Sequence, residues 1–359
     1  MSSELERRLE GLLAEAPEPE VGAGEEALHR ALHALLPVAA PRRGARTAVL
    51  VFAAAVVLLA VAAGSLAAAG ALHVSFGSKT KQRPTTTQLS LPAGAHGIAA
   101  IVDGRLTVVT KGGFRLQGLR ATAATLSPHA LFVAAGIGRS LVALAPDGRR
   151  PWSQAAGGRV IAIAWAPDAI RIAYVVHAGR HFVLHVIWGN GKHESTIDGS
   201  VRPVQPSWRA DSLAFAYVGA GGKAIVYDLG HRKRRVFGPH APVTRLAFAP
   251  VGRTLAVATP GSAILGGKTV AGGDIEALGW LGGRLVVASE LGVTPPLVRI
   301  FATDGLQVGS FRVPGRAVAV TGGYVVARRG QVLAARSPAR SVSILTVPPK
   351  ATVTDVALG

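Results

Sequence analysis

The stretch IAWAPDAIRIAYVV at residues 163–176 decides the fold, because it holds a short apolar strand ending in Trp165, a turn, and a second apolar strand. Related stretches recur along the chain. They read TLSPHALFVAAG from 125, PSWRADSLAFAYVG from 206, LAFAPVGRTLAVAT from 246, LGWLGGRLVVASE from 278 and VAVTGGYVVARRG from 318. Repeats of this kind bury a continuous core only by stacking on their neighbours.

The spacing of the repeats indicates the architecture. The residue that anchors each first strand recurs at intervals of 39, 43, 40, 32 and 40 residues, the period of a four-stranded propeller blade. Two more strand-like segments follow a repeat, as in KAIVYDLG and RRVFG after residue 222. The anchors are expected to pack as structural core between blades. They are Leu126, Trp165, Trp208, Phe248, Trp280 and Val320.

The first and last segments complete one another. Residues 97–119 hold only three strands, and the C-terminal TVTDVALG matches VTRLAFAP in form. It brings Leu358 38 residues after Val320, one further blade period. The sequence therefore predicts an all-β, seven-bladed β-propeller over residues 97–359, in which the C-terminal strand is the inner strand of the first blade. Closure of this kind removes exposed sheet edges.

The turns of the repeat carry a family resemblance. Ala166-Pro167-Asp168 and Ala249-Pro250 resemble the WD40-like repeats of the TolB propeller family, whose units read like W-S-P-D-G-x-x-I-A-Y. The resemblance covers about 97–358, and SLVALAPDGRRPWS from 140 also resembles quinoprotein-like repeats. It implies a propeller fold with a binding or scaffolding role, and it implies no particular ligand.

A membrane segment precedes the repeats. The run AVLVFAAAVVLLAVAAGSLAAAGAL lies in residues 47–72, which hold no ionisable side chain, and it would extend about 39 Å as a helix at 1.5 Å per residue. That length crosses a bilayer core of about 30 Å. The alternative is a cleaved signal peptide, with small residues near Ala69 as its cleavage site, but the 46 preceding residues favour an uncleaved anchor.

The positive charges beside this run predict its orientation. Arg42, Arg43 and Arg46 lie closer to it than the basic residues on its other side. Positive residues favour the cytoplasmic side. We therefore expect a single-pass protein of the cell membrane, with a cytoplasmic tail at 1–46, a transmembrane helix at 47–72, a linker at 73–96 and an extracytoplasmic propeller.

The tail contains two short amphipathic segments, SELERRLEGLLA from 3 and EEALHRALHALL from 25. This layout is similar to that of membrane-tethered anti-sigma regulators, which implies an alternative signalling function in which the tail binds a cytoplasmic partner. The His-Cys-Cys zinc pattern of that family is missing. His29 and His33 have a spacing compatible with metal ligation, but no third ligand lies nearby.

The charge balance predicts the class of partner. The chain has 39 basic and 20 acidic residues, and eight of the acidic ones lie in the first 26 positions. The remainder is strongly basic, which favours a protein or an anionic cell-envelope polymer as partner; nucleic acid is not expected. The alternative is that edge charges only block strand pairing. The predicted contact residues are Arg232, Lys233, Arg234 and Arg235 on the outer strand of blade four, joined by Arg149 and Arg150 of another outer strand.

Candidates for chemistry are few. The absence of cysteine excludes disulfides and thiolate ligands, and no G-x-S-x-G nucleophile motif occurs. Asp274 and Glu276, two apart on the first strand of blade six, are one candidate carboxylate pair. We expect no catalytic activity, no cofactor and no metal. The remaining metal candidates are the blade-three histidines His177, His181, His185 and His193.

Overall fold

The computed structural model describes residues 91–92, 95–111, 115–145, 148–239, 241–290, 296–313, 315–329, 332–338, 341–346 and 351–358. The predicted tail, the predicted transmembrane helix and most of the predicted linker lie outside these ranges. Among the residues that it does describe, no helix combines the length and hydropathy needed to cross a bilayer.

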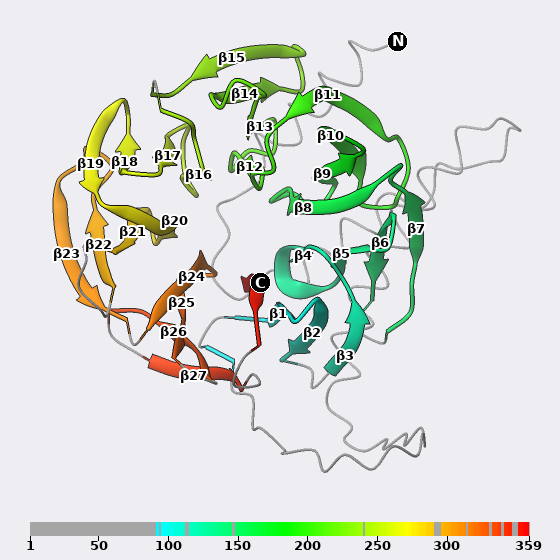
Figure 1. Ribbon diagram of the computed structural model, residues 1–359, viewed down its shortest axis with the longest axis horizontal. Helices are drawn as coiled ribbons and strands as arrows, with labels where there is room; N and C mark the ends of the chain where they lie inside the picture. Colours follow the sequence, from blue (N-terminus) through cyan, green and yellow to red (C-terminus); the bar gives the residue numbers. More distant parts are fainter. Residues whose placement is uncertain are drawn as a thin grey trace, which may run out of the picture. The chain divides into compact units, whose positions relative to one another are not determined.

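Seven four-stranded antiparallel sheets form a ring around a central axis (Figure 1). Blade one is built from β28 (Val353–Leu358), β1 (Gly97–Val102), β2 (Arg105–Thr110) and β3 (Arg115–Arg120). Blade two has β4 (Ala124–Leu126), β5 (Val133–Ile137), β6 (Ser140–Leu144) and β7 (Trp152–Ala155), with a 3-10 turn, η3 (Pro128–Ala130), after β4. Blade three has β8 (Arg159–Trp165), β9 (Arg171–Ala178), β10 (His181–Trp188) and β11 (Ser195–Val201).

The other four blades follow the same order, from the innermost to the outermost strand. Blade four has β12 (Ser207–Trp208), β13 (Ala214–Val218), β14 (Ala224–Asp228) and β15 (Lys233–Phe237). Blade five has β16 (Arg245–Phe248), β17 (Leu255–Thr259), β18 (Ser262–Leu265) and β19 (Lys268–Gly272). Blade six has β20 (Asp274–Leu281), β21 (Arg284–Glu290), β22 (Leu297–Phe301) and β23 (Gln307–Arg312). Blade seven has β24 (Arg316–Thr321), β25 (Tyr324–Arg329), β26 (Val332–Arg336) and β27 (Ser341–Thr346).

Burial explains why the inner half of each blade is so apolar. The second strands of blades four and five, AFAYV in β13 and LAVAT in β17, are buried at every position, since each lies between two neighbouring blades. Such strands are near-continuous apolar runs, whereas a sheet face in water would show alternation. The outermost strand β15, KRRVF, is exposed at its first four positions. The buried residues therefore form clusters between blades.

The up-and-down strand order gives the ring two distinct faces. We call face A the face where the innermost strands end. It carries the turns that follow those strands, which include 127–132, 166–170, 209–213 and 249–254, and also the turns between the third and fourth strands of each blade. Face B is where the inner strands begin. Because β1 pairs antiparallel with β28, the chain enters β1 at face A.

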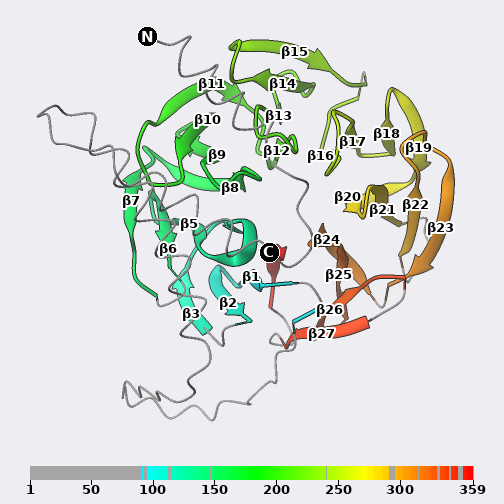
Figure 2. The same ribbon diagram turned by 180° about the vertical axis from the view of Figure 1, so that it is seen from behind.

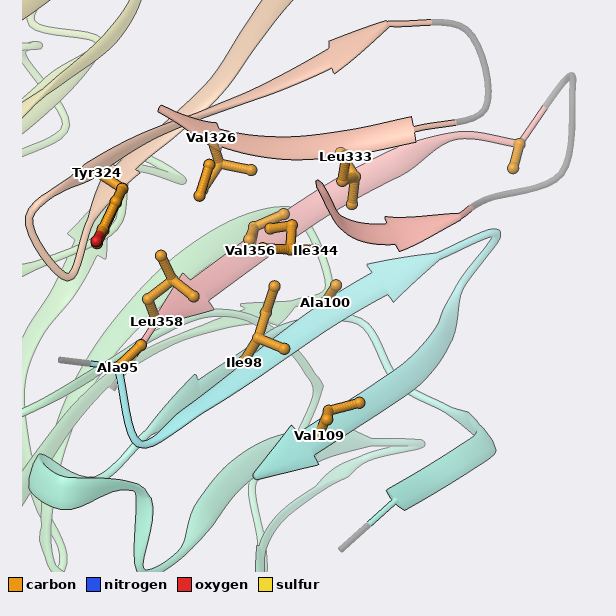
Figure 3. Packing of buried hydrophobic residues seen from close by; sticks show 12 residues of the cluster. Ala95, Ile98, Ala100, Val109, Tyr324, Val326, Leu333, Ile344, Val356 and Leu358 are labelled. Carbon is orange, nitrogen blue, oxygen red and sulfur yellow. The ribbon is translucent and has the colours of Figure 1, made fainter. Parts of the chain in front are cut away.

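The C-terminal strand closes the ring, as the sequence predicted. β28 is the innermost strand of blade one and pairs with β1, Leu358 opposite Ile98 and Val356 opposite Ala100, and it is seen from behind in Figure 2. Figure 3 shows Val356 and Leu358 between the first blade and Val326 of blade seven, in one buried cluster. The predicted seven blades and their closure are confirmed.

Removing the closing strand tests its contribution to stability. Deletion of residues 351–359 is expected to lower the free energy of unfolding by more than about 4 kcal/mol, since three core side chains, Ala351, Val356 and Leu358, are lost and the inner edge of β1 is left unpaired. Urea unfolding followed by circular dichroism measures this, with Thr354→Ala, an exposed position of β28, as the control. An unchanged midpoint for the truncated chain would show that β28 does not hold the ring together.

Candidate functional site: the central channel

The axis of the ring is hollow. The inner strands of the blades enclose about 910 Å³, and this space opens at face A between Pro167, Ala210, Pro250 and Gly282. A second hollow of about 700 Å³ lies at the start of the inner strands, on face B. Its lining includes Arg245, Glu276, Arg316, Arg328 and Thr352. Concave sites with a few convergent polar groups are where ligands bind by default.

Side chains of the inner strands bond one blade to the next. The buried indole of Trp208 donates from Nε1 to the carbonyl of Ala164 at 2.9 Å. Trp280 repeats this bond with Ala247 at 3.0 Å, two blades further along. The anchor aromatics are therefore structural, as predicted: Trp208 and Phe248 are buried, while Trp165 and Trp280 are partly buried against core clusters.

Two channel carboxylates have the same structural role. Asp355 on β28 accepts the backbone N–H of Ala124 in blade two at 3.0 Å. Glu276 on β20 accepts the N–H of Ala317 in blade seven at 2.9 Å, and Arg316 Nε lies 3.3 Å from its other oxygen. Each carboxylate thus satisfies a donor on the next inner strand, where no ladder partner exists. Burial raises the pKa of Asp355 to about 6.

The predicted pairing of Asp274 with Glu276 is wrong. The register of β20 shifts between Ile275 and Ala277, and a bulge of this kind re-aims the side chains beside it. Asp274 is exposed, whereas the Glu276 side chain is only 6% exposed. The two carboxylates therefore occupy different environments and do not form the adjacent acid and base that glycoside hydrolysis requires.

Arg245 is a second cation on the channel wall, besides Arg316. Its Nε donates to the carbonyl of Ile275 at 3.2 Å, and it lines both hollows. Burial by the walls lowers its pKa, while Asp274 and Glu276 act in the opposite direction. The mouth at face B consequently combines three arginines, Arg245, Arg316 and Arg328, with the bonded carboxylate of Glu276, and its character is cationic.

The histidines of blade three do not converge. His185 stacks on Tyr174 and its Nδ1 lies 3.2 Å from Glu194, whereas His193 packs on Trp188. The Tyr174 hydroxyl also donates to Glu194; burial raises the pKa of this tyrosine and lowers that of His185. No group of three metal-ligating side chains occurs within the described ranges. Sequence reasoning missed Glu194, which precedes β11 and meets the other residues only through strand pairing.

The predicted basic residues fall into separate places. Lys233, Arg234 and Arg235 lie on the outermost strand β15, as expected, but Arg232 is in the preceding turn with a φ of 53°. Arg234 pairs with Asp198 of blade three at 3.4 Å and donates to the carbonyl of Ile197, so it also links two blades.

The other predicted pair lies two blades away. Arg149 and Arg150 precede β7, in the turn of blade two at face A, and blade three lies between them and Arg232. The structure therefore keeps Arg232, Lys233 and Arg235 together as one exposed group, here called the β15 basic group. It does not join Arg149 and Arg150 to that group.

Two solved structures resemble this ring. A chain from a crystal structure of the mitotic checkpoint complex is 14% identical, with a TM-score of 0.51, over 77% of this chain and 99% of that one. TolB from Acinetobacter baumannii is also 14% identical, with a TM-score of 0.45, over 61% of this chain. The chain spans 64% of the length of that TolB structure.

The similarity supports the propeller fold and nothing finer. No protein-family model matches the sequence, and no curated protein matches it. At 14% identity the likeness to the mitotic checkpoint chain establishes architecture alone, because one fold serves many functions. Function therefore has to be argued from the surfaces of this propeller.

Replacing Asp355 tests the role assigned to the channel carboxylate. Its folded pKa of about 6 exceeds the ordinary 3.8, so its contribution to stability is complete below pH 3.8 and is lost as the pH rises through 6. Asp355→Asn keeps an acceptor for Ala124 and cannot ionise. It should be more stable than the parent at pH 8 by about 1–3 kcal/mol, and similar to it near pH 4.

Urea unfolding at both pH values measures the difference. Thr354→Ala, an exposed and non-ionisable position of the same strand, is the control and should leave the pH dependence unchanged. Parallel pH profiles for Asp355→Asn and the parent protein would contradict the assignment.

Proposed function

We propose that the propeller is a non-enzymatic binding or scaffolding module, held outside the cytoplasmic membrane by the segment 47–72, for a protein or an anionic envelope polymer. The observation that carries this proposal is that the acidic residues of the ring are few and mostly bonded within the protein, whereas the basic residues are numerous and mostly exposed. Thirty of the 39 basic residues, but only 12 of the 20 acidic ones, follow residue 83.

Most of the described acidic groups of the ring are engaged within the protein. Glu276 and Asp198 contact arginines, and Asp355 accepts a backbone N–H. Asp168, Asp211 and Asp304 each accept the N–H of the residue two positions later in their turns. The basic side chains are mostly exposed, the β15 basic group among them. A surface of this kind attracts anionic partners over a distance of about one Debye length, ~10 Å.

The lining of the channel also favours binding over catalysis, because its carboxylates are engaged within the protein. Both of its inner-strand carboxylates bond to backbone groups of the next blade, so their position serves ring assembly. A hydrolase of the paired-carboxylate type needs one acid and one base aimed at the same substrate bond. The cationic mouth at face B, with Arg245 and Arg316, instead suits an acidic group that enters from solvent.

Charge removal at the β15 basic group tests the proposed contact. The full chain in neutral-lipid nanodiscs is titrated with fluorescent poly(glycerol phosphate), and the triple variant Arg232→Ser, Lys233→Ser, Arg235→Ser is compared with the parent. Binding at low salt should weaken about tenfold or more, at up to ~1 kcal/mol per charge, and the difference should shrink at high salt.

The matched control removes three positive charges from face B, in Arg159→Ser, Arg180→Ser and Lys223→Ser. These side chains are exposed, and the change in net charge is the same. If both triple variants lost binding equally, the binding would reflect only general attraction to the positive net charge of the protein. Undiminished binding by the β15 variant would remove this group from the contact.

The proposed location is tested by reporter fusions. A reporter that is active only outside the cytoplasm should be active after Gly359 and inactive before residue 47, because the arginines at 42, 43 and 46 favour retention of the tail. A cytoplasmic reporter should give the reverse pattern in both positions. Activity of the export reporter at the N-terminal position alone would overturn the orientation and, with it, the proposed function.

A further inference from the structure

Exposed apolar side chains gather on face A. The described residues include nine large hydrophobic side chains that are exposed, and seven of them lie at this face, whereas Val236 and Val308 lie on outer strands. Face B has none of the nine. The seven are Leu131, Phe132, Ile170, Trp188, Leu213, Val251 and Leu306. Single exposed apolar residues are ordinary, but a set confined to one face indicates a binding surface.

Five of these residues occupy equivalent positions of successive repeats. Leu131 and Phe132, Ile170, Leu213 and Val251 lie in the turn after the inner strand of blades two, three, four and five. We call them the apolar tips. They follow one arc of the ring beside the mouth of the channel, whose lining includes the neighbouring residues of the same turns. Polar and glycine residues separate them, so they form an arc of points and not a continuous groove.

The turns hold several of these side chains in fixed positions. Asp168 accepts the N–H of Ile170, and Asp211 accepts that of Leu213, each across a residue with positive φ. The turn of blade six repeats the pattern, with Asp304 accepting the N–H of Leu306. Each carboxylate fixes the backbone just before an apolar residue that is more than half exposed. Apolar residues fixed in solvent lower the entropic cost of binding.

The chain reaches the ring at this same face. The ring of His96, just before β1, makes an edge contact with His129 at 5.6 Å, in the turn that carries Leu131 and Phe132. The carbonyl of His96 accepts the N–H of Lys111. The apolar run at 47–72 lies upstream, and the sequence from 73 to 90 is long enough to extend at most about 60 Å. The described chain therefore enters the first blade at the face with the apolar tips.

Exposed cations surround the apolar tips. Arg150, Lys192, Arg253 and Arg284 are exposed in turns or at strand ends of face A. Trp188 lies at the same face, with a partly exposed ring tilted against the ring of His193. Apolar points, an exposed tryptophan and flanking cations are the combination that suits the boundary between anionic headgroups and acyl chains.

We propose that face A of the propeller docks on the lipid bilayer that anchors the chain, with the apolar tips inserted between headgroups and the flanking cations at the phosphates. This inference rests on the proposed membrane anchor at 47–72. It leaves face B directed away from the lipid and the outermost strand β15 at the rim of the ring, both available to the partner proposed above.

Site-specific labels test which face meets the lipid, and the absence of native cysteine makes every introduced thiol unique. The full chain is reconstituted in vesicles that contain phosphatidylcholine and phosphatidylglycerol. One variant carries Val251→Cys, a tip that is 79% exposed, and its matched control carries Lys223→Cys, an exposed position at face B of the neighbouring blade. Each thiol receives a fluorophore, and quenching by a lipid-borne nitroxide is measured.

The label at 251 should be quenched by the lipid nitroxide. In unlabelled samples, the thiol at 251 should react with a membrane-impermeant maleimide about tenfold more slowly than the thiol at 223. A tenfold effect corresponds to the burial of about two CH₂ groups. Adding Leu131→Ser, Ile170→Ser and Leu213→Ser should abolish both differences. Because these side chains are exposed, the melting temperature should not change, which separates release of the face from unfolding.

Flotation of the vesicles on a density gradient separates failure of the docking from failure of the anchor. If the protein floats and the label at 251 is neither quenched nor protected, the docking is wrong and the anchor stands. Protection without lipid quenching would mean that a second copy covers face A, and it would overturn the proposal. A protein that does not float overturns the anchor and the docking together.

Discussion

Neighbouring blades approach so closely near the axis that some positions have no room for a side chain. A Cβ on Gly136 would lie 2.8 Å from the Cβ of Val160 in the next blade, and one on Gly279 would lie 2.7 Å from that of Val320. Each inner strand is therefore pressed against the next without a shared hydrogen-bond ladder. Backbone groups that a ladder would have satisfied need other partners, and the side chains of Ser207, Trp208, Glu276 and Asp355 supply some of them.

This constraint also explains which parts of the architecture were predictable. Small residues beside a bulky anchor recur at each blade, so the repeat, the seven blades and the closing role of TVTDVALG could be predicted from spacing. The partners of the channel carboxylates could not, because they depend on how adjacent sheets are offset. The bulge beside Glu276 separates it from Asp274, and nothing in the letters DIEALGW marks that irregularity.

The surface was predictable only in part. The basic residues at 232–235 indicated an exposed outer strand. However, Arg234 forms an ion pair with Asp198, which lies 36 positions earlier in the sequence and belongs to the neighbouring blade three. Two of the apolar tips, Ile170 and Leu213, had a signal that could have been found: an aspartate stands two positions before each, in PDAI and ADSL, and TDGL repeats the pattern at Leu306. Sequence alone does not say that these turns share one face, since that follows from the direction in which each inner strand runs.

The strand that completes blade one is separated from its partner by the whole of the remaining ring. During synthesis, β1, β2 and β3 therefore emerge long before β28, and blade one has no inner strand until every other blade has left the ribosome. Pairings of such high contact order form slowly. For the proposed export of this domain as an extended chain, late closure would be an advantage, because the ring cannot reach its final shape before its last strand is available.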